Sequence, residues 1–301
     1  MRSPWHAGEK RLQAQVGVGA RMEVVGQKVI RDYMPDQHRA FYQRLPFIVA
    51  GSVDAAGRPW ATVIEGPEGF ISAPDPQRLV IDADFPSNDP ATSGLVTGSA
   101  IGLLGIELHT RRRNRLNGLI RWVDTGRLEV KVEQSFGNCP QYIRRRTHSR
   151  VEAPSQGRQD AVALDAMTRA MIENADTFFV ASYVDLDHAQ RCVDVSHRGG
   201  RPGFVKVQAD RLTIPDYAGN LHFNTLGNLC LNPVAGLLFI DFTTGDVLHV
   251  FGRTEVILDS PLISAFEGAE RIWTLDVEQV VLRRAAVSLR WSVGDTPPVS
   301  V

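Results

Sequence analysis

A glycine-rich basic segment at residues 194–206 is the first candidate for chemistry. Its sequence, DVSHRGGRPGFVK, ends a β-rich run in three glycines that stand beside basic side chains. Backbone N–H groups in such turns form concave donor sites, and an arginine guanidinium is a fork that fits phosphate oxygens. The segment therefore predicts a binding site for an anion. The competing interpretation is a solvated hairpin turn with surface arginines.

A second candidate follows at residues 219–233, GNLHFNTLGNLCLNP, where a short strand leads into a short helix. We expect Asn224 at the N-cap of this helix and Pro233 at its end. A helix N-terminus presents free N–H donors and a positive dipole end, which suit a phosphate. Asn224, Thr225 and Asn228 would face that phosphate. Each has an ordinary explanation alone, as a cap, a first-turn residue or a buried amide, but their joint occurrence favours a binding site.

Other motifs argue against several classes of protein. The run RRRNR at residues 111–115 is predicted to be a solvated hairpin tip, with contact to a dinucleotide phosphate or a partner protein as the alternative. The eight histidines show no metal-ligand spacing, and His222 and His249 are interpreted as ordinary strand residues. The sequence lacks a G-x-S-x-G elbow and a Walker lysine loop, so neither a hydrolase nor a nucleoside triphosphatase is predicted.

These candidate segments lie in a mostly β pattern. Short β-branched and aromatic runs separated by turn residues predict the closely spaced strands of a small barrel or sandwich. A long hairpin is expected over residues 234–258, and its counterpart over residues 101–132 has its turn near 111–116. Helices are expected at residues 36–44, 140–146, 164–174, 225–231 and 261–267.

An internal repeat organises these elements. GLLGIEL at residues 102–108 matches GLLFIDF at residues 236–242, a displacement of 134 positions from Gly102 to Gly236. Displacements of 133 and 131 positions align residues 78–81 with 211–214 and residues 47–50 with 178–181. Collinear matches with small slips predict two related modules. Chance similarity between strand compositions is the competing interpretation.

The repeat and a polar stretch around Pro154 divide the chain into four expected parts. These are an N-terminal extension at residues 1–36, a first module at 37–148, a linker at 149–162 and a second module at 163–301.

The first module is expected to have lost the anion site. Its turn at residues 65–70 carries two carboxylates where the second module has Arg198 and Arg201, and negative charges repel a phosphate. Residues 88–97 show no match to the stretch from Asn224 to Asn228. We therefore assign ligand contacts to the second module and a structural or pocket-covering role to the first.

Composition and charge limit the partners of the chain. Lys and Arg number 33 against 34 Asp and Glu, so the net charge of −1 gives no general attraction to nucleic acid or to a membrane surface. The least polar run, at residues 94–106, is too short to span a bilayer, and no apolar signal segment begins the chain. The three cysteines have no CxxC spacing, which favours a reducing compartment. We expect a cytoplasmic protein.

Several motifs together resemble the pyridoxamine 5'-phosphate oxidase-like, FMN-binding split-barrel family. They are PGF at 202–204, GN at 219–220, NTLGN at 224–228, NPVAGLLF at 232–239, GNCPQYI at 137–143 and WHAGE at 5–9. The resemblance covers most of the chain. It implies a mainly β protein with a few helices, built as two tandem split β-barrel modules. It also implies a homodimer with FMN in a groove between subunits, although two modules in one chain could cover each other instead.

The resemblance assigns FMN contacts residue by residue. Ser196, Arg198 and Lys206 would contribute from the strand and turn, and Asn224, Thr225 and Asn228 would contribute from the helix start. Many family members carry Arg or Lys where this chain has Asn224 and Asn228. Phosphate affinity is therefore expected to be weaker, or the bound group to be different.

The resemblance implies an FMN-dependent oxidoreductase in which the flavin carries the electron chemistry and the protein positions it. Its partners would be an unknown small-molecule redox substrate and an electron-donor reductase. FAD is an alternative cofactor. A non-catalytic flavin carrier or sensor, a structural dimer, and a haem protein ligated by His222 or His249 are the competing functions.

Overall fold

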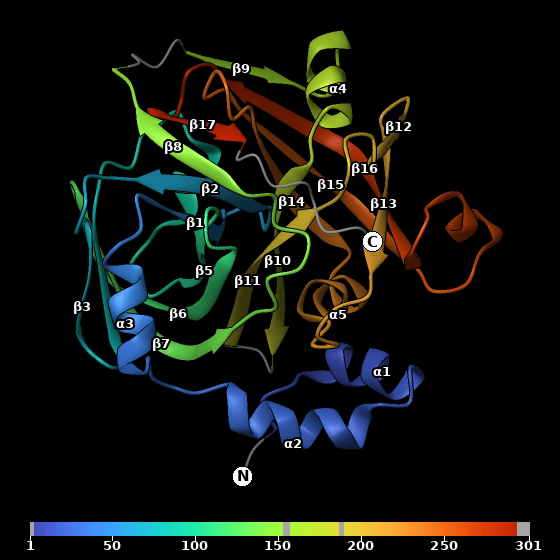
Figure 1. Cartoon of the computed structure of the whole chain (residues 1–301), viewed down its shortest axis with the longest axis horizontal. Helices are drawn as coiled ribbons and strands as arrows, with labels where there is room; N and C mark the ends of the chain where they lie inside the picture. The colour runs from blue at the N-terminus through green and yellow to red at the C-terminus, as the bar shows by residue number, and fades with distance from the viewer. Residues whose placement is uncertain (1–2, 153–156, 187–189, 294–301) are drawn as a thin grey trace.

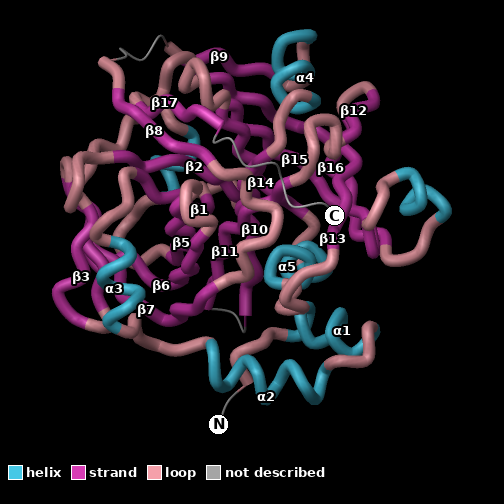
Figure 2. The backbone as a smooth tube through the Cα atoms, in the orientation of Figure 1, coloured by secondary structure: helices cyan, strands magenta, loops and turns pink. Residues whose placement is uncertain are grey.

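Two large antiparallel β-sheets dominate the computed structural model, which describes residues 3–152, 157–186 and 190–293 (Figure 1). The sheets lie side by side, and the helices are confined to their periphery (Figure 2). Within the described residues, no helix is long and apolar enough to cross a bilayer.

The first sheet has the strand order β2-β1-β5-β6-β7-β4-β3. Its strands are β1 (Phe47–Val53), β2 (Pro59–Glu65), β3 (Ile71–Asp75), β4 (Arg78–Asp82), β5 (Ala100–Glu107), β6 (Arg112–Asp124) and β7 (Arg127–Gly137).

The second sheet has the strand order β11-β10-β14-β15-β16-β13-β12. Its strands are β10 (Thr177–Leu186), β11 (Gln190–Gly199), β12 (Lys206–Gln208), β13 (Arg211–Tyr217), β14 (Val234–Ile240), β15 (Val247–Ile257) and β16 (Ala269–Arg283). The additional strand β9 (Arg158–Ala161) pairs with β16, and β8 (Arg146–Arg150) pairs with β17 (Leu289–Val293) in a small separate sheet.

The second sheet repeats the first strand for strand, and the equivalence extends to the register. Gly51 on β1 pairs with Gly102 on β5, and Ala181 on β10 pairs with Gly236 on β14. The register shifts at the equivalent position in both sheets, because β7 has one extra residue opposite Asn117 and Gly118, and β16 has one extra residue opposite Phe251 and Gly252. The predicted mainly β fold with two tandem split-barrel modules is therefore confirmed.

The register corrects one part of the sequence alignment. Ile48, and not Phe47, is the equivalent of Phe178, because β1 and β10 are displaced by 130 positions. Side chains alternate between the two faces of a strand, so a one-residue slip exchanges the buried and outward sets. The same register places Ile64, and not Glu65, at the position of Arg198.

The two modules pack against each other within the chain. Each has its own apolar core, and a third cluster that includes Val49, Leu104, Phe179 and Leu238 lies between them. β5 faces β11, and β14 faces β2, so the two modules are related by an approximate two-fold axis.

Most of the expected helices are present. α3 (Asp36–Tyr42), α4 (Ala166–Glu173) and α5 (Asn224–Leu231) confirm three of them, and a 3₁₀ helix, η2 (Pro261–Ala265), replaces the fourth. A further 3₁₀ helix, η1 (Pro90–Gly94), packs on β1 and β2 of the first module.

The prediction of a helix at residues 140–146 is wrong. These residues form a turn, and Tyr142 has a left-handed backbone conformation with φ of 64°. The Tyr142 ring stacks on Tyr217, and its hydroxyl donates to the carbonyl of Ala218 (2.8 Å). Contacts with the second module therefore decide the conformation of this segment.

The N-terminal extension forms two helices that pack below α5, as Figure 1 shows. They are α1 (Ala7–Gln15) and α2 (Gly19–Val29). The expected linker at residues 149–162 contains the end of β8 and all of β9, so paired strands occupy both of its ends. Its residues 153–156 lie outside the described residues, and the remaining domain boundaries stay predictions.

The close approach of the modules at Gly102 leads to a test of stability. A Cβ on Gly102 would lie 2.9 Å from Asp194 Cα and from the carbonyl oxygen of Val193, so the backbone would have to shift. We expect Gly102→Ala to lower the free energy of unfolding by about 1–3 kcal/mol in urea titrations. Gly19→Ala is the control, because the nearest atoms to the added Cβ, in the Ala14 backbone, lie 3.8 Å away, and it should change stability by less than about 0.5 kcal/mol. Equal stability of the two variants would contradict the packing described here.

Candidate functional site

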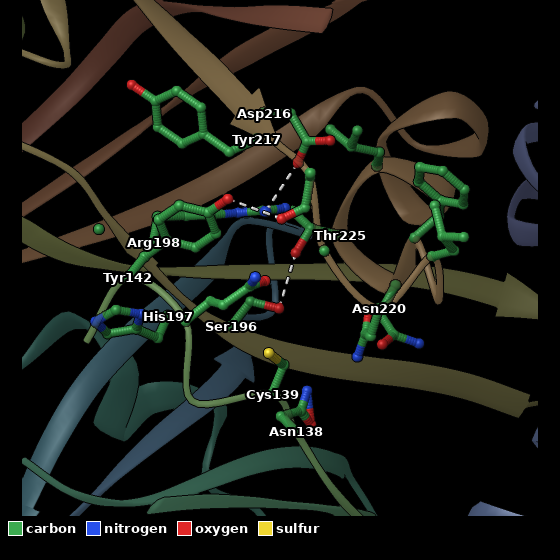
Figure 3. A pocket seen from close by; sticks show the side chains of 18 of the residues that line it. Asn138, Cys139, Tyr142, Ser196, His197, Arg198, Asp216, Tyr217, Asn220 and Thr225 are labelled. Atoms are coloured by element: carbon green, nitrogen blue, oxygen red, sulfur yellow. Dashed lines mark hydrogen bonds and ion pairs between the residues drawn. The ribbon is translucent and has the colours of Figure 1, made fainter. Parts of the chain in front are cut away.

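The candidate site is a pocket of about 110 Å³ between the two modules. The first module contributes β6 and residues 138–142 after β7, and the second contributes β11, the loop from β13 to α5, and the start of β16. Figure 3 shows Asn138 and Asp216 on opposite sides of the pocket, with Ser196 between them. Neither module alone contains the complete pocket.

Four of the six predicted contact residues line this pocket, namely Ser196, Arg198, Asn224 and Thr225. Lys206 does not line it. Its side chain is exposed at the start of β12, where Nζ donates to the carbonyl of Ala265 (3.3 Å) and lies 4.5 Å from the Phe266 ring centroid.

Asn228 also lies outside the pocket. Its Nδ2 donates to Ser182 Oγ (3.0 Å), and its Oδ1 lies 2.8 Å from Nε2 of His6. It lines a second cavity of about 300 Å³ between the N-terminal segment and β11, and Asn224 lines both cavities.

Alternation along β11 explains why Ser196 and Arg198 meet at the pocket. Asp194, Ser196 and Arg198 are two residues apart and share one face of the strand. Thr225 Oγ1 donates to Ser196 Oγ (2.9 Å), and Arg198 Nη1 donates to Asp216 Oδ1 (2.9 Å), as Figure 3 shows. One strand thus supplies a hydroxyl and a guanidinium to the same space.

The start of α5 differs from expectation by one residue. Phe223 is the N-cap, with a left-handed φ of 60° and no capping side chain, and Asn224 is the first helical residue. The Asn224 amide is engaged elsewhere, because Nδ2 donates to Glu9 Oε1 (2.5 Å) and Oδ1 accepts from Arg115 Nη1 (2.6 Å). The amide therefore joins the N-terminal extension to the pocket.

Two pocket residues were missed because the run at residues 111–115 was predicted to be a solvated hairpin tip. That prediction is wrong: the turn precedes residue 112, and Arg113 and Arg115 lie in β6. Arg115 is only 4% exposed. The internal repeat held the signal, since a displacement of 134 places Arg113 at Val247, which lies within the predicted hairpin at residues 234–258 and is the first residue of β15.

Arg115 crosses from the first module into the second. Its Nη2 donates to Ser196 Oγ (2.6 Å), and its Nη1 lies 2.9 Å from Asp194 Oδ1. Such charge-assisted contacts are the stronger kind of hydrogen bond. The guanidinium therefore ties the floor of the pocket together across the module boundary.

Arg113 supplies positive charge without a carboxylate partner among the described residues. Its Nε donates to the carbonyl of Cys139 (2.8 Å), and its Nη1 donates to Nδ1 of His197 (3.1 Å). Burial, together with the nearby Arg115, lowers the pKa of Arg113 to about 10, so the guanidinium stays charged at neutral pH. The same surroundings hold the pKa of His197 well below its usual value, so that ring is neutral.

The lining of the pocket has more cations than anions. Four guanidiniums, those of Arg113, Arg115, Arg198 and Arg271, face two carboxylates, those of Asp216 and Glu270. Asp216 is shared by two of the arginines, and Glu270 contacts Arg271. Asp194, which lies outside the lining, forms an ion pair with Arg115 and adds a third carboxylate. Four guanidiniums against three carboxylates still leave one positive charge uncompensated.

Several buried polar atoms in the pocket lining have no hydrogen-bond partner within the described part of the chain. They are Arg115 Nε, Arg198 Nε, His197 Nε2 and Asn138 Oδ1. Buried donors without partners are costly. Three of these four atoms are donors in the network described, and an anion would accept from such groups.

Aromatic rings border the same pocket. Tyr142 and Tyr217 stack with centroids 5.4 Å apart and an interplanar angle of 26°, and the Phe223 ring lies 4.9 Å from the Arg271 guanidinium carbon. Aromatic faces favour offset stacking against other rings. The arrangement suits a ligand that combines an anionic group with a planar ring.

The N-terminal extension reaches the pocket through a buried carboxyl group. Burial raises the pKa of Glu9 to about 8, against the lowering effect of hydrogen bonds from the His6 backbone and from Asn224. Gly8 and Gly227 meet where α1 crosses α5, and Glu9 packs beside that contact. The N-terminal extension therefore packs against the start of α5 and bonds to its first residue.

The raised pKa of Glu9 predicts a pH-dependent stability. The unfolded chain releases this proton near pH 4.5 and the folded chain near pH 8, so stability falls as pH rises between these values. The slope is at most about 1.4 kcal/mol per pH unit. Glu9→Gln should remove this contribution in urea titrations at pH 5 to 8, whereas Glu173→Gln, an exposed control, should not. Identical pH profiles for wild type and Glu9→Gln would contradict the assignment.

Comparison with known proteins adds a family match. The family model described as pyridoxamine 5'-phosphate oxidase matches residues 34–166. None of the curated proteins matches the sequence.

Similar solved structures include HupZ from Group A Streptococcus, with 13% identity, 39% of this chain and 92% of that chain covered, and a TM-score of 0.31. An FAD-binding protein from Mesorhizobium loti has 15% identity, with 43% and 99% covered and a TM-score of 0.29. The FAD binding protein from Mycobacterium smegmatis has 13% identity, with 41% and 98% covered and a TM-score of 0.28. The match to the family model shows that residues 34–166, which hold the first module, are similar to the pyridoxamine 5'-phosphate oxidase family.

Proposed function

We propose that the pocket between the modules binds the phosphate and ring of FMN, and that the protein is a flavin-dependent oxidoreductase. The observation that carries this proposal is the uncompensated, desolvated guanidinium of Arg113 beside buried donors that lack partners. The match of residues 34–166 to the pyridoxamine 5'-phosphate oxidase family model supports a flavin as the ligand.

The residues present fit a phosphate. A phosphate monoester carries about −1.5 to −2 charges at neutral pH, which would compensate the surplus of guanidiniums in the lining. Ser196 and Thr225 supply hydroxyl groups, and Arg113 and Arg198 supply guanidiniums. The backbone N–H groups in the first turn of α5 add donors beside Thr225.

The residues at the border of the pocket fit a planar ring system. Tyr142 and Tyr217 offer aromatic faces, and Asn138 and Asn220 offer amide groups to ring-edge atoms. A bound flavin would supply the electron-transfer chemistry, and the chain would supply binding, orientation and partial exclusion of water. The proposal requires no side chain to act as an acid or base.

The pairing of the modules within the chain supports a complete site in one chain. The homodimer, the redox substrate, the electron-donor reductase and the cytoplasmic location stay predictions.

The haem alternative has no support from the positions of its candidate ligands. His222 packs against Trp5 and Phe136, and His249 is fully buried beside Trp60. Neither residue lines the pocket between the modules.

Flavin binding can be tested by absorption spectra during titration with FMN. We expect bands near ~370 and ~450 nm that bleach with dithionite, as a redox-active flavin requires. Arg113→Gln should weaken binding by about 10- to 100-fold, because a charge-assisted contact to phosphate is worth about 1–3 kcal/mol.

Lys206→Ala is the matched control, because it removes a basic residue that lies outside the pocket, and it should bind FMN within about twofold of wild type. A protein that ignores added FMN would overturn the proposal. Loss of binding in Lys206→Ala with retention in Arg113→Gln would place the phosphate elsewhere, and tighter binding of FAD would change the cofactor.

Catalysis is tested separately from binding. We expect the FMN-loaded protein to pass two electrons per turnover from reduced nicotinamide to an added electron acceptor such as dioxygen, directly or with an added flavin reductase. Arg113→Gln should lower the rate at subsaturating FMN by the same factor as its binding defect. A loaded protein with neither activity would be a flavin carrier or sensor.

A further inference from the structure

The approximate two-fold axis relates the pocket to a counterpart at a second place between the modules. Ala50 pairs with Thr62 in the first sheet as Val180 pairs with Ser196 in the second, so Thr62 is the equivalent of Ser196. By the same registers, His249 is the equivalent of Arg115, and Arg283 that of Asn138. The counterpart therefore lies between β2 of the first module and β15 and β16 of the second.

A protein carboxylate occupies this counterpart. Asp89 Oδ2 accepts from Thr62 Oγ1 and from Arg283 Nη1, and Asp89 Oδ1 accepts from the backbone N–H of Ala91 (2.9 Å). Asp89, Thr62 and Arg283 are all less than 5% exposed. Both hydroxyls therefore donate to a carboxylate, since Ser196 Oγ donates to Asp194 Oδ2 (3.2 Å). Asp194 lies on the same strand as Ser196, whereas Asp89 is the N-cap of η1 and enters the counterpart from the position equivalent to the start of α5.

Side chains fill the rest of the counterpart. Trp60, Ala91, Phe251 and Val281 form one buried cluster there. Trp60 packs edge-on against His249, whose Nδ1 lies 3.0 Å from the carbonyl oxygen of Ala61. The aromatic rings that border the second module's pocket have no open equivalent on this side.

The two sites differ in charge balance as well as in space. In the first module, Asp89 balances Arg283, and burial lowers the pKa of His249 to about 4, so that ring is neutral. In the second module, the guanidiniums exceed the carboxylates, and Phe223 precedes α5 in place of the aspartate that precedes η1. In one site a carboxylate lies at the start of the short helix that borders it, whereas in the other the carboxylates of Asp194, Asp216 and Glu270 leave one guanidinium uncompensated.

We propose that Asp89 is a built-in anion that takes, in the first module, the place that a ligand's phosphate takes in the second, so that one chain binds one ligand. This inference rests on the proposed function for the identity of that ligand. Replacement of Asp89 by a residue without a side chain should therefore create a second anion-binding site at Thr62 and Arg283.

The test uses inorganic phosphate and Asp89→Gly in the full chain. Removal of the carboxylate leaves Arg283 buried without its partner, so the melting temperature should fall. Phosphate should then raise the melting temperature of Asp89→Gly by several degrees more than that of wild type, because a ligand that binds only the folded state stabilises it. Sodium chloride at the same ionic strength should not raise the melting temperature of Asp89→Gly more than that of wild type.

Asp89→Asn is the matched control, because its amide keeps the position filled. It should lose stability but gain no more from phosphate than wild type does. Equal phosphate effects in the glycine and asparagine variants would overturn the inference.

Stoichiometry keeps the inference testable if Asp89→Gly fails to fold. Calorimetric titration of wild type with FMN should give one site per chain, and two sites would overturn the inference. A wild type that binds no FMN would refute the proposed function, while a phosphate effect specific to Asp89→Gly would still support the built-in anion.

Discussion

The close packing of the two modules is the constraint on which the rest of the structure depends. Gly102 of β5 lies against β11, and Gly236 of β14 lies against β2, so two sheets approach at backbone distance in two places related by an approximate two-fold axis. Any side chain at these glycines would separate the modules. Because the pocket takes residues from both modules, its shape and charge follow from this contact.

Because the two modules belong to one chain, their equivalent positions can carry different residues. The pocket and its counterpart therefore contain different charged side chains. In one site Arg115 and Arg113 enter from β6, and a cavity remains beside buried donors that have no partner among the described residues. In the other, Arg283 enters from β16 and meets Asp89. A dimer of identical subunits could not differ in this way, so the tandem arrangement allows one site to bind a ligand while its counterpart becomes part of the core.

The N-terminal extension contacts a residue of the pocket from outside the split-barrel modules. Glu9 bonds to Asn224, and Asn224 bonds to Arg115, so a buried carboxyl group on α1 is joined to the pocket floor through two contacts. Burial raises the pKa of Glu9 to about 8. The free energy of unfolding therefore falls as pH rises, because the folded chain holds a proton that the unfolded chain releases. The extension therefore positions Asn224, a residue that lines the pocket.

The sequence by itself determined the mainly β class, the repeat, the 234–258 hairpin, three of the helices and four residues of the pocket, because strand alternation, turn residues and caps are local signals. It could not determine the placement of Arg113 and Arg115, since an arginine run has the same local pattern in a solvated turn and in a strand that enters a neighbouring module. The turn at Tyr142, the distance of Lys206 from the pocket and the role of Asp89 likewise depended on contacts between distant residues. Only the tertiary structure brought those groups together, because burial and pairing decide whether a charge faces water, another side chain or a ligand.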